Sequence, residues 1–205
     1  MFQLLVKGGP VMYLLLLCSF AGVYIIVEKI LYIKSNVIDS NYAIDKIKNR
    51  LVSIGKEQTL RELRTDRRLM LQVISSAIKY SDLPKDMIQE AIKEVTYREL
   101  PKLEKNMNVL SSIITVAPIM GLLGTVLGLM DVFNVISGGN LGDAAALSSG
   151  IAEALITTVT GLSIAIPFIF LNQFLMHKIE VFVLETERLI NEIIVFSTTH
   201  KGVKP

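Results

Sequence analysis

The sequence predicts an all-α integral membrane protein with three transmembrane helices, the second and third extended into a cytoplasmic helical bundle. Three stretches are apolar and lack charged side chains, namely residues 11–27, 106–130 and 154–176. About 20 helical residues cross a hydrocarbon core of roughly 30 Å, and 17 suffice in the shortest spans. A content of 51% hydrophobic and 20% charged residues also fits a membrane protein.

The first span lies in a segment, residues 1–35, that also contains the N-terminus. Its apolar run ends at Glu28-Lys29, and no small-x-small cleavage site follows. The run is also long for the apolar core of a signal peptide. We therefore interpret it as a retained anchor rather than a cleavable signal peptide.

Residues 36–105 are predicted to form a helical loop without an independent catalytic domain. Two runs of apolar residues at helical spacing precede and follow Gly55. Asp82 with Pro84 favours a further helix start. That last helix is expected to run into the second span, with Pro101 as its only likely site of kinking.

A basic cluster lies within this loop, formed by Arg61, Arg64, Arg67 and Arg68. One interpretation is a solvated helix face neutralised by Glu57, Glu62 and Asp66. The alternative is contact with the anionic headgroups of membrane lipids.

The second span, residues 106–137, is unusually rich in small residues. Gly121, Gly124 and Gly128 surround the single hydroxyl of Thr125. A span facing only lipid would be filled with large aliphatic side chains. Small residues allow close helix packing, so this pattern favours a helix packed beside a pore.

The third span, residues 151–177, follows a short loop at 138–150 and carries Gly161 as a further packing residue. Glu153 lies at its outer boundary, where a carboxylate is unfavourable unless hydrated or paired. Thr158 could bond back to its own helix. However, counting from the span midpoints places Thr125 and Thr158 both about 10 Å outward. This predicts one shared polar level on two antiparallel helices. The apolar stripe continues beyond the span, so the tail at 178–205 is predicted to be helical.

Lysine and arginine are concentrated on one side of the spans. Residues 28–110 contain 16 of the 21, whereas residues 138–150 contain none. Cytoplasmic loops carry the excess of positive charge. The N-terminus and the 138–150 loop are therefore predicted to lie outside, and the 36–105 loop and the C-terminus in the cytoplasm.

The sequence offers no support for an enzyme, a metal site or a cofactor site. His177 and His200 lack spaced metal-ligand partners. The glycines of the second span precede no Lys-Ser or Lys-Thr pair, which argues against a phosphate-binding loop. Cys18 is the only cysteine. We expect membrane lipids and other protein chains as partners, and no nucleic acid.

Two motifs stand out in the second and third spans. The first is Ala117-Pro118 leading into the GLLGTVLG stretch at 121–128, and the second is GIAEAL at 150–155, followed by Thr158 and Gly161. Together they resemble the MotA/TolQ/ExbB proton channel family, more closely its ExbB/TolQ branch. Departures from the branch are Leu123, Leu127 and Ser149, at positions where Phe, Trp and Pro are frequent. These departures weaken a choice between ExbB and TolQ.

The resemblance implies a homopentamer in the cell inner membrane, whose second and third spans surround a pore. Two copies of a single-span partner similar to ExbD or TolR would lie in that pore. Thr125 and Thr158 would line it, and Glu153 would shape its outer entrance. A TonB-like or TolA-like protein would carry the work of the proton motive force to the outer membrane.

An independent argument from the residues also points to a partner chain. Residues 106–130 and 154–176 contain no ionisable side chain. A hydroxyl can hydrogen-bond a carboxylate but cannot carry the proton itself. The titrating acid, which the resemblance implies to be an Asp, should therefore come from another chain. The alternatives are a passive helical scaffold or assembly factor, and a flagellar-stator-like, MotA-type subunit, although that branch usually has four spans.

Overall fold

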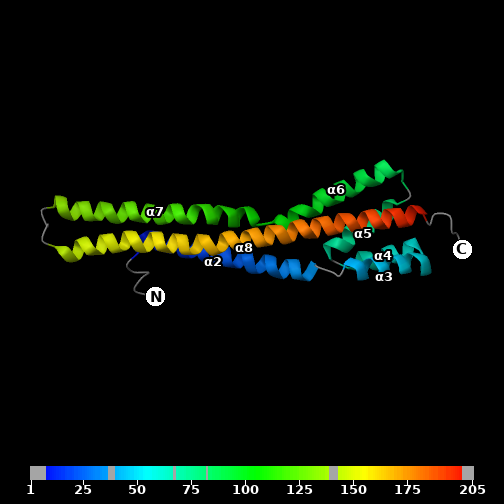
Figure 1. The fold of residues 1–205 in the computed structure, drawn as a ribbon, viewed down its shortest axis with the longest axis horizontal. Coiled ribbons are helices and arrows are strands. Elements are labelled where there is room, and N and C mark those ends of the chain that lie inside the picture. The colour runs from blue at the N-terminus through cyan, green and yellow to red at the C-terminus, as the bar shows by residue number, and fades with distance from the viewer. Residues whose placement is uncertain (1–7, 37–39, 67, 82, 139–142, 200–205) are drawn as a thin grey trace. The chain divides into compact units, whose positions relative to one another are not determined.

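The computed structural model describes residues 8–36, 40–66, 68–81, 83–138 and 143–199, and all regular secondary structure in these ranges is helical (Figure 1). In chain order the helices are α2 (Gly9–Asn36), α3 (Ser40–Ser53), α4 (Lys56–Thr65), α5 (Leu69–Tyr80), α6 (Lys85–Glu104), α7 (Met107–Ser137) and α8 (Ala144–Thr199). The predicted all-α fold is confirmed.

Three of these helices are long and apolar enough to cross a membrane. They are α2, α7 and the part of α8 at Ala144–Phe196, with mean hydropathies of 2.2, 2.1 and 2.1. α2 and α8 each contain one of the three uncharged stretches, and α7 contains all of the second stretch except Asn106. The number and order of the candidate spans therefore agree with the sequence.

The chain divides into two compact units, which are described separately. Unit 1 comprises Met1–Glu28 and Asn106–Phe174, and unit 2 comprises Lys29–Lys105 and Leu175–Pro205. Both α2 and α8 are continuous through the boundary, since each helix contributes residues to both units.

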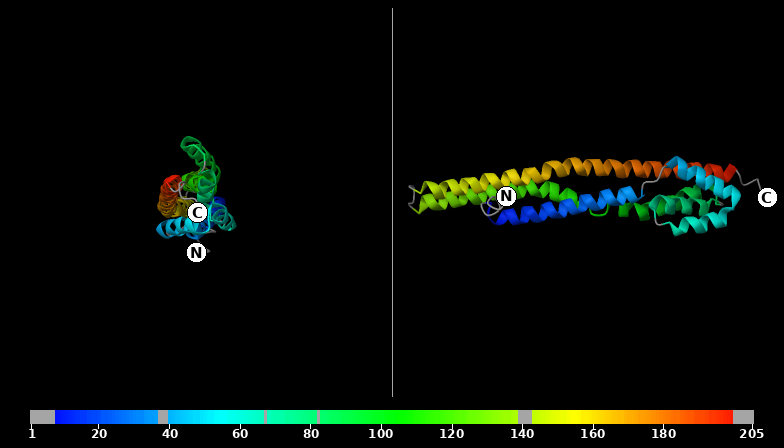
Figure 2. Two further views of the ribbon diagram at one scale, coloured as in Figure 1. Left: turned by 90° about the vertical axis from the view of Figure 1, so that its right-hand side faces the viewer. Right: turned by 90° about the horizontal axis from the view of Figure 1, so that it is seen from below.

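Unit 1 is built from α7, the first part of α8 and the first part of α2. The ribbon shows α7 and α8 side by side and antiparallel (Figures 1 and 2). Val11 and Leu15 of α2 pack in one core cluster with Ala117 of α7. Further along α2, Gly22 lies directly against the ring of Phe168. The first span therefore packs on the hairpin of the other two.

The start of α7 differs from the sequence prediction. Pro101 lies inside α6, and the chain turns instead at Asn106, which adopts a left-handed conformation with φ of 66°. Asparagine tolerates this conformation better than most residues. Its Nδ2 donates a hydrogen bond of 2.9 Å to Oε2 of Glu28 on α2. The prediction of one continuous helix from residue 85 into the second span is thus wrong. The chain leaves the helical conformation at Asn106, whose side chain bonds to α2.

The start of α8 also lies earlier than the predicted third span. Oδ1 of Asp143 accepts the backbone N–H of Ala146 at 2.9 Å, which is the geometry of an N-terminal cap. From this start α8 runs for 56 residues without interruption. It therefore continues into the tail as predicted, where a buried stripe includes Ile179, Phe182 and Ile193.

Unit 2 packs around α5, a short helix with seven buried residues. Val73 and Ala77 of α5 form a core cluster with Ile88 of α6 and with Ile190 and Ile194 of α8. Elsewhere in this unit, Nζ of Lys48 on α3 pairs with Oε1 of Glu192 on α8 at 2.5 Å.

The start of α5 is held by a side chain from α2. Oδ1 of the buried Asn36 accepts the backbone N–H of Leu69 at 2.9 Å, while its Nδ2 donates to the carbonyl of Tyr32 at 2.9 Å. The first N–H groups of a helix have no partner within the helix. Asn36 therefore satisfies a buried donor that α5 cannot satisfy itself.

We expect Asn36→Leu to destabilise the protein by about 1–3 kcal/mol, because it leaves the N–H of Leu69 without its acceptor. Asn49→Leu, at an exposed position on α3, is the matched control and should have little effect. Thermal unfolding of the purified full chain in detergent checks both. Equal melting temperatures for the two variants would contradict this role.

Candidate functional site

Small side chains line the contact between α7 and α8 at every turn. All eight of these residues are buried, and we call them the small-residue seam: Ala117, Gly121, Gly124 and Gly128 on α7, and Gly150, Ala154, Thr157 and Gly161 on α8. They recur at spacings of three or four, which keeps them on one face of each helix.

The glycines of the seam allow one backbone to touch the other. A Cβ added to Gly161 would lie 2.5 Å from the carbonyl oxygen of Ala117, and one added to Gly128 would lie 2.6 Å from that of Gly150. A Cβ on Gly121 would lie 3.0 Å from the backbone of Thr157 and Thr158. Because backbone atoms on both sides cannot easily yield, these positions accept no larger side chain without moving the helices.

Thr157 is a seam residue that the sequence reasoning did not single out. It has no exposed surface, and its hydroxyl donates to the carbonyl of Ala154 at 2.9 Å. Its side chain occupies the space opposite Gly124, where an added Cβ would lie 2.5 Å from the Thr157 Cβ. Its spacing from Ala154 and Gly161 was the signal that could have found it.

Thr158 bonds across the seam. Its Oγ1 donates to the carbonyl oxygen of Gly121 on α7 at 3.0 Å, and its side chain is half-buried. Thr125 is also half-buried, but its Oγ1 donates at 2.6 Å to the carbonyl of Leu122 in its own helix. Each hydroxyl has therefore used its only proton, and each keeps lone pairs that can accept one.

The two threonine hydroxyls lie at nearly one level. Oγ1 of Thr125 bonds to the carbonyl of Leu122, and Oγ1 of Thr158 bonds to the carbonyl of Gly121. These are consecutive carbonyls of α7, and consecutive residues of a helix differ by about 1.5 Å along its axis. The two hydrogen bonds therefore agree with the predicted shared polar level. The role of this level in a proton path stays a prediction.

Glu153 lies on the third span, nine residues after the start of α8, and is half-buried. Its carboxylate packs against Gly9 at the start of α2, where φ is +62°. A Cβ at Gly9 would collide with this carboxylate. The structure therefore places Glu153 beside the start of the first span. Within the described residues, no hydrogen bond joins its carboxylate to the hydroxyl of Thr125 or Thr158.

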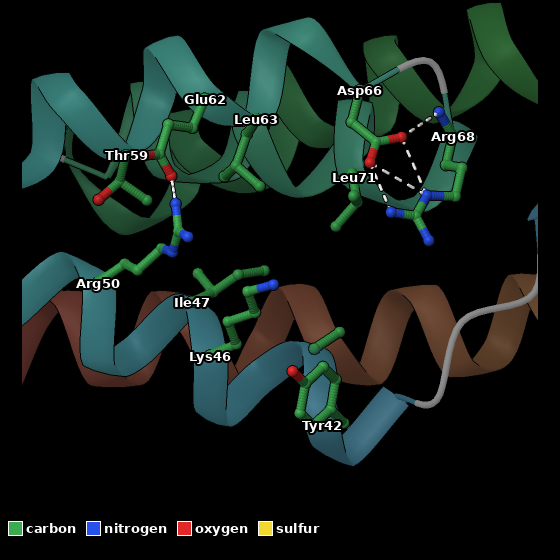
Figure 3. A pocket seen from close by; sticks show the side chains of 11 residues that line it. Tyr42, Lys46, Ile47, Arg50, Thr59, Glu62, Leu63, Asp66, Arg68 and Leu71 are labelled. Atoms are coloured by element: carbon green, nitrogen blue, oxygen red, sulfur yellow. Dashed lines mark hydrogen bonds and ion pairs between the residues drawn. The ribbon is translucent and has the colours of Figure 1, made fainter.

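A hollow lies in unit 2, between α3, α4 and α5 (Figure 3). It measures about 240 Å³ and is lined by both charged and apolar side chains. Arg50 of α3 pairs with Glu62 at one end, and Arg68 pairs with Asp66 at 2.6 Å at the other. Hydrogen bonds from the Arg68 guanidinium hold the pKa of the Asp66 carboxyl below its usual value.

The basic cluster is only partly neutralised as predicted. Asp66 neutralises Arg68, but Glu62 pairs with Arg50 of another helix. Arg61 and Arg64 are exposed, and Arg67 lies outside the described residues. The structure thus leaves lipid contact by the exposed arginines as a prediction. Across the described ranges, no group of three His, Cys, Asp or Glu residues is placed to hold a metal ion.

Comparison with known proteins decides the family. The model of the MotA/TolQ/ExbB proton channel family matches residues 61–188, which include the whole of α7 and both halves of the seam.

The chain belongs to the MotA/TolQ/ExbB proton channel family.

Relatives within this family carry the names ExbB and TolQ. A Methanothermobacter thermautotrophicus protein named as an ExbB homologue is 30% identical over 85% of this chain and 62% of its own length. The Tol-Pal system protein TolQ of Haemophilus influenzae is 37% identical over 42% of this chain and 39% of its own. The biopolymer transport protein ExbB of Aquifex aeolicus is 34% identical over 44% of this chain and 62% of its own. The chain thus matches less than two thirds of the length of each of these relatives.

Membership of a proton channel family confirms the resemblance found in the sequence, and it agrees with a membrane protein that is not an enzyme. The seam lies within the matched residues. The roles of Thr125, Thr158 and Glu153 in a proton path stay predictions. The roles of Gly121, Gly124, Gly128 and Gly161 in assembly also stay predictions.

We expect Gly161→Ala to destabilise the protein by about 1–3 kcal/mol, because the new Cβ meets the backbone oxygen of Ala117. The direction of the change in stability is informative, since replacing Gly by Ala inside a helix normally stabilises the helix by about 1 kcal/mol. Ser163→Ala, exposed two residues further along α8, is the control. Thermal unfolding in detergent measures both, and a Gly161→Ala protein at least as stable as the parent would refute the seam contact.

Proposed function

We propose that the chain is the channel and motor subunit of an inner-membrane complex that uses the proton motive force to energise outer-membrane processes through a TonB- or TolA-like protein. The observation that carries this proposal is the hydrogen bonding of the Thr125 and Thr158 hydroxyls. Thr125 and Thr158 offer acceptor lone pairs on two adjacent spans. Neither uncharged stretch of these spans contains a group that could carry the proton.

The proton carrier is then a carboxyl group of a partner chain. A single-span ExbD- or TolR-like protein with an Asp in its span would supply it. Because both threonine hydroxyls already donate to carbonyls, the group they receive without rearrangement is the protonated acid, which donates to them. An ionised carboxylate would instead require each hydroxyl to break its bond and turn. The partner's acid would thus be held differently in its two protonation states.

The assembly proposed for this chain is a homopentamer with a dimer of the partner in its central pore. Helices α7 and α8 would line that pore, with the N-terminus periplasmic and the C-terminus cytoplasmic. Glu153 would lie at the outer entrance. The seam supports this arrangement because it makes α7 and α8 one closely packed hairpin. Such a hairpin can be repeated around an axis without opening a gap within each subunit.

The energy available sets how many protons the motor needs. Moving one charge through about 100 mV supplies roughly 2.3 kcal/mol. A load of more than a few kcal/mol per cycle therefore requires several protons, delivered through more than one carboxyl or in repeated steps.

A passive helical scaffold is the competing function, because the seam glycines serve packing in either case. A MotA-type stator subunit is less favoured, since that branch usually has four spans and the described residues contain three candidate spans. Proton flux separates a channel from a scaffold. Co-purification with a single-span protein encoded nearby would identify the partner needed for the measurement.

In vesicles containing this protein and its single-span partner, we expect Thr125→Val and Thr158→Val each to lower proton flux by at least about tenfold. Valine keeps the shape of threonine but cannot accept a hydrogen bond. Thr115→Val is the matched control, because Thr115 also lies on α7 and also donates to its own helix, at 3.0 Å to Ser111. Parental flux in both test variants, at equal protein recovery, would remove the threonines from the path.

For Glu153 we expect Glu153→Gln to lower proton flux and Glu153→Asp to retain part of it, because only the latter keeps the charge. Glu187→Gln, an exposed acid on the same helix, should leave the flux unchanged. The measurement is proton uptake with a protonophore control. A Gln variant with the parental rate would show that Glu153 only packs against Gly9.

A further inference from the structure

At the end of unit 1 opposite Glu153, one buried polar atom has no partner. Oδ1 of Asn172 on α8 is buried, and within the part of the chain that the structure describes no donor reaches it. A buried acceptor left without a donor is unfavourable in a folded protein. Asn172 also interrupts the apolar stripe of α8, between the buried Phe168 and Leu175.

The register of α7 places Asn106 at the level of Asn172. Ala117 of α7 touches Gly161 of α8, and the two helices are antiparallel. Asn106 lies eleven residues before Ala117, and Asn172 lies eleven residues after Gly161. Eleven residues are close to three full helical turns. Asn172 therefore returns to the face of α8 that meets α7, and Asn106 lies at its level just before the start of α7.

The register of α2 brings Glu28 to the same level. Gly9 of α2 adjoins Glu153 of α8, and Gly22 adjoins Phe168, so these helices run in the same direction. Continuing this register places Glu28 within about one turn of Asn172. The direction of its side chain is fixed by the 2.9 Å hydrogen bond from Nδ2 of Asn106 to Oε2 of Glu28.

These three residues, Glu28, Asn106 and Asn172, form what we call the polar layer. Its two amide groups can hydrogen-bond the Glu28 carboxyl in both of its protonation states. The ionised carboxylate accepts the hydrogen bond from Asn106 and can donate none. The protonated acid has one O–H to donate, and the unpartnered Oδ1 of Asn172 is an acceptor at its level.

We propose that Glu28 is a proton-exchanging carboxyl of the channel, held by Asn106 when ionised and by Asn172 when protonated. This inference rests on the proposed function, to which it adds a station for the proton beyond the threonines. Fourteen residues separate Thr158 from Asn172 on α8, or about 21 Å. The proton therefore reaches Glu28 through water, and it leaves Glu28 to water on the other side.

Charged groups near the polar layer are few. Residues 107–130 of α7 and 154–176 of α8 contain none. The nearest along each segment are Lys29 after Glu28, Lys105 before Asn106, and His177 with Lys178 beyond Asn172. All of these cations belong to unit 2. Within the described spans of unit 1, Glu28 is thus the acid of this layer.

The first test is proton flux in vesicles that contain the full chain and its single-span partner. Glu28→Gln should lower the flux by about tenfold or more, and Asn172→Leu should lower it severalfold. Gln173→Leu, at the exposed neighbouring position, is the control and should keep the parental flux. If Asn172 were only an unsatisfied packing residue, Asn172→Leu would give a more stable protein with unchanged flux. That result, or parental flux in Glu28→Gln, would overturn the proposal.

The second test does not depend on conduction. The infrared C=O band of protonated carboxyls is recorded for the purified full chain in lipid nanodiscs while the pH is lowered. The proposal expects one band to be absent in Glu28→Gln, and the same band to move to higher frequency in Asn172→Leu, where the acid has one hydrogen bond fewer. If the parent complex conducts no protons, the proposed function fails. This band still tests whether Asn172 accepts a hydrogen bond from protonated Glu28. An unmoved band in Asn172→Leu contradicts it.

Discussion

The close approach of α7 and α8 is the constraint on which the other features of unit 1 depend. Where Gly161 meets Ala117 and Gly128 meets Gly150, there is no room for a side chain between the backbones. In a membrane, helices associate through packing and hydrogen bonds, since lipid tails are as apolar as leucine. Contacts between small residues therefore fix both the spacing and the register of the hairpin. The cross-helix bond from Thr158 to Gly121 is possible only at this spacing.

This register has consequences at both ends of the hairpin. At one end it sets Glu153 beside the start of α2. At the other it sets Asn172 level with Asn106, whose left-handed conformation separates α7 from α6. The polar groups of unit 1 thus lie at separate depths along one packed hairpin. For a proton channel, such an arrangement requires water or a partner side chain to connect them.

Much of the fold could be predicted from the sequence, because the spans and the glycine pattern are local signals. The break at Asn106 could not, since it involves a hydrogen bond to Glu28, 78 residues away in the sequence. The shared level of the Thr125 and Thr158 hydroxyls could be predicted by counting depth along the two uncharged stretches, and their hydrogen bonds to the consecutive carbonyls of Leu122 and Gly121 agree with it. The acceptor of Thr158 on the other helix could not be predicted, because it depends on the close approach of the two backbones. Thr157 had the right spacing, but a buried threonine is not distinguishable from a pore-lining one by spacing alone.

The central claim is that this chain supplies a polar, closely packed hairpin while another chain supplies the titrating acid. Its most direct test is proton uptake into vesicles under an imposed membrane potential, with three preparations compared: this protein alone, this protein with its single-span partner, and the same complex with the partner's span Asp replaced by Asn. The account predicts uptake only in the second preparation. Uptake of equal rate by this protein alone, or by the complex without the partner's acid, would contradict it.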